Sequence, residues 1–317
     1  ALLVAAARSA GAGGIVFHAP RGLEDAGRVA ATALGTGGTS TEGGPEVTEI
    51  SVVGDEDAGP LMSLAAGMEG AAASHPLGDA VVRYAKAHGL TPATVRRVVH
   101  HAARGVTALT ASGETAVLGN RQLLLDHSIS VAVADAAAAR GESRGHTALF
   151  LGVGGRVRAV LSLRDEVGIG ARAAVQRMFD QRIVVVLVSG DSRATVEVIA
   201  RQLDVNLVKA ELLPEERGEE VRRLGASGGL VAAVGRRGAD DEMLAAAEVP
   251  ILLSAAGSPG ADRGIALATT DIRDASAALW MARAARSEAL RGVLLSVGAG
   301  APLVAGADGE EDAPEGF

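Results

Sequence analysis

The second half of the chain alternates short runs of Val, Ile, Leu and Ala with segments that have helical spacing. The run "IVVVLVS" (183–189) is apolar at successive positions, which is typical of a strand that is buried on both faces of a sheet. Between about residue 160 and residue 295, runs of this kind are separated by amphipathic segments. Parallel strands need long crossover connections, and helices supply them. The sequence therefore predicts an α/β fold in which helices cover both faces of a parallel sheet.

The region from residue 48 to residue 158 has a different pattern. Two segments with helical spacing are followed by several short β-like runs. This order predicts an inserted α+β domain at residues 48–158. Residues 1–47 and 159–297 are then expected to form one α/β domain, which the insert interrupts. Residues 298–317 are expected to be an acidic, disordered tail.

Composition argues against several classes of partner. The chain has no cysteine, so it can form neither a disulfide nor a thiolate metal site. Its net charge is -8, and basic residues do not cluster with aromatic ones, so we expect no nucleic-acid binding. No run reaches the ~18 apolar residues that a membrane span needs. We therefore expect a soluble, cytoplasmic protein whose partner is a small molecule or another protein.

One stretch carries the clearest functional signal. Residues 33–46 read "ALGTGGTSTEGGPE" and are followed by Val47 and Thr48. This stretch resembles the F-D-K-T-G-T-L-T-E-G motif, with the following P-E-V-T, of the heavy-metal-transporting P-type ATPases. The resemblance implies a haloacid-dehalogenase-like Rossmannoid fold with an inserted nucleotide-binding-like domain. The Asp that the family phosphorylates falls on Gly35, and its Lys falls on Thr36. Because glycine cannot be a nucleophile, we expect no ancestral ATPase or phosphatase activity.

Further motifs of the same family follow in the same order, and they too are altered. Its T-G-D and L-R-D motifs match Ser189-Gly190-Asp191 and Leu163-Arg164-Asp165, whereas its P-x-x-K lysine becomes Arg217. Its G-D-G-x-N-D motif matches residues 235–240, with Arg236 at the first carboxylate and Asp240 retained. An arginine repels a hard dication. The resemblance therefore implies that Mg²⁺ binding is lost or weak, and we expect no metal site.

The insert resembles the family's nucleotide-binding domain at three points. "SHPL" matches the His-Pro signature, and "AARGV" and "LGNRQLL" match the two loops that receive adenine and ribose. The resemblance implies that ATP or ADP binding is possible, through His75, Gly105, Gly119 and Asn120. Ala103 stands where the family has the first glycine of its loop. The methyl group of Ala103 narrows the approach of a base or phosphate to the backbone.

Two functions follow from these observations. The first is a pseudoenzyme that binds a ligand or partner without transport or aspartyl phosphorylation. The alternative is a repurposed, metal-independent isomerase, lyase or cyclase that uses the cleft between the domains, and that belongs to a biosynthetic pathway. Its candidate catalytic residues are Asp165, Ser189, Asp191, Arg217, Arg236 and Asp240.

Two interpretations of the arginine at position 236 remain open. Arg236 either holds an anion together with the backbone amides of residues 35–38, or it pairs with Asp240 or Asp191 and fills a retired site.

Overall fold

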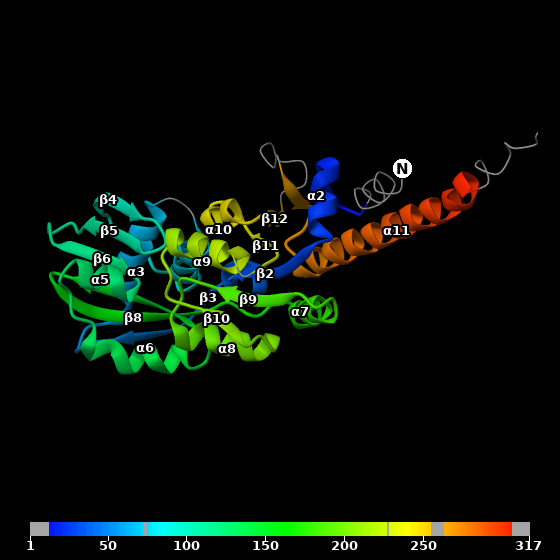
Figure 1. Cartoon of the computed structure of the whole chain (residues 1–317). Coiled ribbons are helices and arrows are strands. Elements are labelled where there is room, and N and C mark those ends of the chain that lie inside the picture. The colour runs from blue at the N-terminus through cyan, green and yellow to red at the C-terminus, as the bar shows by residue number, and fades with distance from the viewer. Residues whose placement is uncertain (1–12, 73–74, 227, 255–262, 306–317) are drawn as a thin grey trace, which may run out of the picture.

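The computed structural model describes residues 13–72, 75–226, 228–254 and 263–305 (Figure 1). In this part of the chain the strands form two sheets, one of seven strands and one of six. In Figure 1 the six-stranded sheet lies at the left, and helix α11 (Ile272–Ala305) runs away from the seven-stranded sheet at the right. The α/β fold with a parallel sheet, which the alternating pattern predicts, is confirmed.

The seven-stranded sheet has the order β1-β13-β12-β11-β2-β9-β10. Neighbouring strands are parallel throughout, except that the edge strand β1 is antiparallel to β13. The central position of β2 places its carboxyl end between those of β11 and β9. The strands of this sheet are β1 (Ile15–His18), β2 (Val29–Gly35), β9 (Val184–Val188), β10 (Leu207–Lys209), β11 (Leu230–Gly235), β12 (Val249–Leu252) and β13 (Gly264–Leu267).

Helices cover both faces of this sheet. Each buries an apolar stripe, as in α7, where Ala171, Ala174, Val175 and Met178 follow the helical period and are buried. The buried residues of α2, α7, α8 and α11 share one core cluster, and those of α9 and α10 share a second. These helices are α2 (Ala19–Ala26), α7 (Ala171–Asp180), α8 (Arg193–Leu203), α9 (Pro214–Ala226) and α10 (Asp241–Ala246).

The six-stranded sheet has the order β3-β8-β7-β6-β5-β4 and is antiparallel throughout. Helices α3 and α4 pack on one face, and α5 and α6 pack on the other. Its elements are β3 (Glu46–Val52), α3 (Ala58–Gly70), α4 (Pro76–Ala87), β4 (Arg96–His101), β5 (Gly105–Leu109), β6 (Thr115–Gly119), α5 (Arg121–Asp126), a short turn at Ala132–Ala134, α6 (Asp135–Glu142), β7 (Thr147–Val153) and β8 (Arg156–Arg164).

Two predicted boundaries differ from the structure. The boundary expected between residues 158 and 159 falls inside β8, because this strand pairs with β3 as far as Arg164 opposite Glu46. Residues 298–305 continue helix α11, although the sequence predicted that they belong to a disordered tail. The acidic residues of that segment begin only at Asp308, and residues 306–317 lie outside the described residues.

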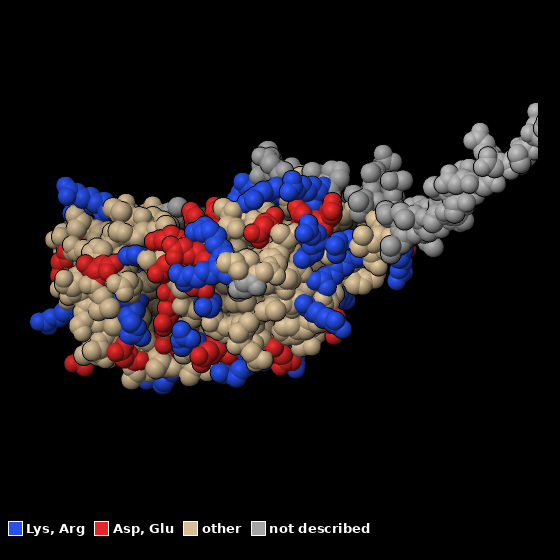
Figure 2. All heavy atoms as spheres, in the orientation of Figure 1, with Lys and Arg blue, Asp and Glu red and all other residues tan. Residues whose placement is uncertain are grey.

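Two further observations concern the surface. Acidic and basic side chains are interspersed on the face in Figure 2, and basic ones are most frequent toward the end that carries α11. No helix in the described part of the chain is both long enough and apolar enough to cross a membrane.

Helix α3 owes its close packing to a glycine in its interior. A Cβ atom built on Gly67 would overlap the carbonyl oxygen of Ala93, in the segment that follows α4. Replacing an interior helical glycine by alanine ordinarily stabilises a protein by about 1 kcal/mol. Here we expect Gly67→Ala to lower the free energy of unfolding by about 2 kcal/mol, because backbone must shift.

The measurement is urea unfolding, with Gly70→Ala as the matched control. A Cβ atom on Gly70 would meet only Val82 Cγ2, at 3.8 Å. An increase in stability for both variants would contradict the close contact at Gly67.

Candidate functional site at the carboxyl ends of the parallel strands

Three neighbouring strands end at one edge of the seven-stranded sheet. Gly35 is the last residue of β2, Ser189 follows β9, and Gly235 ends β11. In open α/β sheets, ligands bind outside the carboxyl ends of the strands. The motif residues of this chain therefore lie where the fold holds ligands.

The carboxylate of Asp240 packs directly against Gly35. Asp240 is 4% exposed. A Cβ atom built on Gly35 would lie 3.0 Å from Asp240 Oδ1 and 3.1 Å from Oδ2. A contact this close forces neighbouring atoms to move. The space in front of β2 is thus taken by a carboxylate from the segment that joins β11 to α10.

Asp240 is held by two donors. Arg217 Nη1 donates to Oδ1 at 3.1 Å, and the backbone amide of Arg236 donates to Oδ2 at 3.0 Å. Burial raises the pKa of the Asp240 carboxyl, and the amide of Arg236 and the charge of Arg217 oppose this effect. Among the described residues, the ion pair of Asp240 is with Arg217, and the charge of Arg236 also acts to lower the pKa of Asp240.

The side chain of Arg236 lies across the loop that follows β2. Its Nη1 atom occupies the space that a Cβ atom would need on Gly38 or on Gly43. Both glycines have positive φ angles, +67° and +72°. Arg236 is partly buried, yet no carboxylate oxygen among the described residues lies within 4.0 Å of its guanidinium. Arg236 is thus a cation in the site without a paired anion in this part of the chain.

Ser189 and Asp191 form a hydroxyl network with Thr36. The Thr36 and Ser189 hydroxyl oxygens lie 2.6 Å apart, and Ser189 donates to Asp191 Oδ2 at 3.0 Å. Thr147, at the start of β7, donates to Asp191 Oδ1 at 3.1 Å. Asp191 therefore connects the two sheets. The sequence did not predict a role for Thr147, since no motif marks it.

Asp165 shapes the loop after β2. It accepts hydrogen bonds from Thr41 Oγ1 at 2.5 Å and from the Gly43 amide at 3.0 Å. Burial raises the pKa of Asp165, and these hydrogen bonds act against the rise. The structure thus divides the six candidates into groups: Ser189 with Asp191, Arg217 and Arg236 around Asp240, and Asp165 on the loop. In the described part of the chain, no three His, Asp or Glu side chains are arranged to hold a metal ion.

The predicted nucleotide residues lie in the six-stranded unit. His75 caps α4, accepting a hydrogen bond from the Gly78 amide at 3.4 Å. Its Nε2 lies 3.6 Å from Oε2 of Glu69. Burial raises the pKa of Glu69 to about 7, and the pKa of His75 is lowered by burial and by His100. Glu69 was not predicted, although it is the one charged residue between residues 58 and 72.

The two loops of the predicted nucleotide site also meet. Gly105 pairs with Gly119 across β5 and β6, and it has φ +139°. Asn120 caps α5, accepting a hydrogen bond from the Leu123 amide at 3.0 Å. Ala103 has φ +57°, a conformation that favours glycine. The ring of His75 lies 5.9 Å from that of His100 on strand β4, and His100 pairs with Val106, the residue after Gly105.

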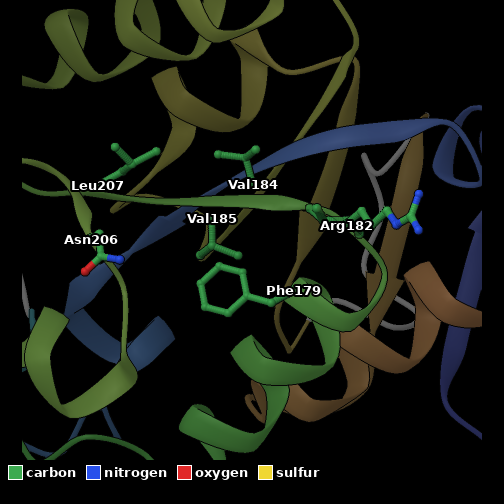
Figure 3. A pocket seen from close by; sticks show the side chains of 7 residues that line it. Phe179, Arg182, Val184, Val185, Asn206 and Leu207 are labelled. Carbon is green, nitrogen blue, oxygen red and sulfur yellow. The ribbon is translucent and has the colours of Figure 1, made fainter.

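The surface of the described part of the chain has at least two cavities. One, of about 340 Å³, lies at the β9–β10 edge of the seven-stranded sheet (Figure 3), and its lining includes Phe179, Val184 and Leu207. The other, of about 300 Å³, lies between α8 and the segments next to β7 and β8. Of the six candidate catalytic residues, Asp165 alone lines either of these two cavities.

A family model described as haloacid dehalogenase-like hydrolase matches residues 37–248. The chain belongs to this family. The matched region includes β9, β11 and every strand of the six-stranded sheet.

Curated relatives narrow this assignment. The probable copper-exporting P-type ATPase of Archaeoglobus fulgidus is 32% identical over 278 residues, which is 87% of this chain and 34% of that protein. The copper-exporting P-type ATPase of Bacillus subtilis is 29% identical over 259 residues, which is 82% of this chain and 31% of that protein. The predicted resemblance to heavy-metal-transporting P-type ATPases is confirmed. The chain spans about a third of the length of these relatives.

Solved structures show the same fold. The catalytic domain of the CPx-ATPase CopB-B, from a study of conformational changes upon nucleotide binding, has a TM-score of 0.70 at 18% identity. The match covers 86% of this chain and 97% of the CopB-B domain. A zinc-transporting PIB-type ATPase in the E2.Pi state gives a TM-score of 0.62 at 24% identity. That match covers 94% of this chain and 48% of the ATPase chain.

The strained backbone at Ala103 yields a prediction. We expect Ala103→Gly to raise the free energy of unfolding by about 1 kcal/mol, because glycine relieves the left-handed conformation. The neighbouring Ala102→Gly is the control, and it should lower stability by a few tenths of a kcal/mol, roughly the entropic cost of glycine. Chemical denaturation of both variants measures the difference. Equal effects of the two changes would contradict strain at Ala103.

The buried carboxyl of Glu69 predicts a pH-dependent stability. Its pKa is about 7 in the folded chain and 4.5 as the ordinary value. The unfolded state therefore releases the proton first, and stability falls as the pH rises from about 4.5 to about 7. We expect Glu69→Gln to be more stable than the parent chain by about 2 kcal/mol at pH 8, and equally stable near pH 4.

Denaturant unfolding at the two pH values checks this expectation, with Glu24→Gln, at an exposed position of α2, as the control. A Glu69→Gln gain of the same size at pH 4 and pH 8 would show that ionisation of Glu69 is not its cause.

Proposed function

We propose that this chain is a nucleotide-binding region of the P-type-ATPase kind that does not form an aspartyl phosphate and acts by binding. The observation that carries the proposal is the end of β2, where Gly35 stands with the carboxylate of Asp240 against its backbone. No side chain at position 35 can attack a phosphoryl group. Transport by the longer relatives is accordingly not proposed for this chain.

Neighbouring hydroxyl groups do not replace the missing nucleophile. An alcohol needs an adjacent general base to become nucleophilic. Thr36 and Ser189 do lie beside a carboxylate, Asp191, but their hydrogen bonds hold that carboxylate in position together with Thr147. This arrangement favours a structural role for all four residues.

The residues at the strand ends fit Mg²⁺ poorly. Mg²⁺ prefers carboxylate and phosphate oxygens in an octahedral arrangement. Gly35 and Arg236 offer no carboxylate, and Asp240 is already bound to Arg217. The unpaired guanidinium of Arg236 adds a positive charge, which opposes a dication. We therefore propose that binding in this chain does not depend on Mg²⁺.

The six-stranded unit supports nucleotide binding. His75 and the loops at Gly105 and Gly119 lie together, and Asn120 is fixed by its cap on α5. The related CopB-B domain is described with conformational changes upon nucleotide binding. We propose that ATP or ADP binds here, with the base near His75.

Isothermal titration calorimetry with ATP and ADP, each with and without Mg²⁺, tests the proposal. We expect binding that is unchanged by EDTA and weakened roughly tenfold by His75→Ala, the loss of about 1.4 kcal/mol. His88→Ala, an exposed ring stacked on Tyr84, is the matched control and should leave binding unchanged. Binding that requires Mg²⁺, or steady release of phosphate from ATP, would contradict the proposal.

A further inference from the structure

The cavity of about 340 Å³ in Figure 3 lies along an open edge of the seven-stranded sheet. Strand β10 is the last in the strand order, so its outer side has no partner strand in the described part of the chain. The pairing of β9 with β10 begins only at Val186, although β9 itself begins at Val184. A further strand could therefore lie beside β10 and the start of β9.

The backbone of β10 offers hydrogen bonds to such a strand. The carbonyl oxygen of Lys209 accepts a hydrogen bond from the amide of Ser189, just after β9, at 2.9 Å. The backbone groups of Lys209 therefore face β9. Because the backbone groups of successive strand residues point to alternate sides, the amide and carbonyl of Val208 face the open edge. Val208 thus presents one donor and one acceptor outward.

Apolar side chains line this edge on both sides of the sheet. Val184 and Leu207 are 47% and 49% exposed, although both are large apolar residues. Figure 3 shows these two side chains on one side of β9, and those of Val185 and Phe179 on the other. Successive side chains of an extended segment also point to opposite faces. An added strand with apolar residues on both faces would therefore cover both pairs.

A single charge accompanies these apolar groups. Of the residues that line the cavity, Arg182 alone is charged. Arg182 is exposed, and no carboxylate oxygen among the described residues, those of Asp180 included, lies within 4.0 Å of its guanidinium. Asp204, which precedes β10, is paired with Arg172. A carboxylate on the added segment would complement Arg182 at the end of the edge where β9 begins.

We propose that the β9–β10 edge binds an extended segment of a partner protein, which adds to the seven-stranded sheet as a further strand. Backbone hydrogen bonds to β10 give such a complex its affinity, and pockets for alternate side chains give it specificity. The segment has alternating apolar residues and one acidic residue opposite Arg182. The inference does not depend on nucleotide binding, which we assign to the six-stranded unit.

Selection of random short peptides displayed on phage against the purified chain tests this edge. We expect the enriched peptides to combine apolar residues with an acidic residue near one end. A synthetic peptide of the enriched sequence, labelled with a fluorophore, then allows binding to be measured by anisotropy on the parent chain and on variants.

Two variants separate the backbone from the charge. Val208→Pro removes the outward amide at a position where an edge strand accepts proline, and we expect it to weaken binding roughly tenfold. Val208→Thr keeps the amide and is its matched control. Arg182 has φ +58°, a conformation that asparagine tolerates, so Arg182→Asn removes the charge without new strain and should also weaken binding. Arg201→Asn, at an exposed position of α8, is the control for Arg182→Asn and should bind as the parent does.

The thermal midpoint of each variant verifies that it is folded. Peptides that bind folded Val208→Pro and Arg182→Asn as tightly as the parent chain would overturn the proposal, and so would a selection that enriches no peptide. Dimerisation of the parent chain that Val208→Pro abolishes, without peptide binding, would show that a second copy occupies the edge, and would also overturn it. Failure of ATP or ADP to bind would contradict the proposed function and leave this inference intact.

Discussion

The contact between the Asp240 carboxylate and the Gly35 backbone determines the character of the site. It joins the carboxyl ends of β11 and β2, and it exists because position 35 has no side chain. A carboxylate introduced at position 35 would lie beside that of Asp240, and two such groups cannot both ionise without a cation between them. In this chain the balancing charge is Arg217. Arg217 and Asp240 thus form an ion pair at the carboxyl ends of β2 and β11.

The loop after β2 is held by Asp165 and by the side chain of Arg236. Asp165 fixes its course through Thr41 and Gly43, and Gly38 and Gly43 leave the space that the Arg236 side chain occupies. Any larger residue at either glycine would displace the guanidinium. The loop therefore both orders the site and gives it a cation that is covalently part of the chain. A bound dication would have to compete with that fixed charge.

The sequence predicted the fold well because both of its periodic patterns are strong. The alternation after residue 160 predicted the parallel sheet. Pairing geometry was less predictable: which carboxylate binds Arg217, and that β8 reaches Arg164, depend on contacts between distant segments. Glu69 and Thr147 were missed because neither belongs to a motif, and only folding brings them to His75 and Asp191.

The most direct test of the account is a phosphorylation assay. The purified chain would be incubated with ATP labelled at the γ-phosphate and Mg²⁺, quenched in acid, and treated with hydroxylamine, which cleaves acyl phosphates. We expect no hydroxylamine-sensitive label above background, because Gly35 has no nucleophilic side chain and Asp240 is paired with Arg217. Stoichiometric label that hydroxylamine removes would contradict it and would mean that another carboxylate has taken over the reaction.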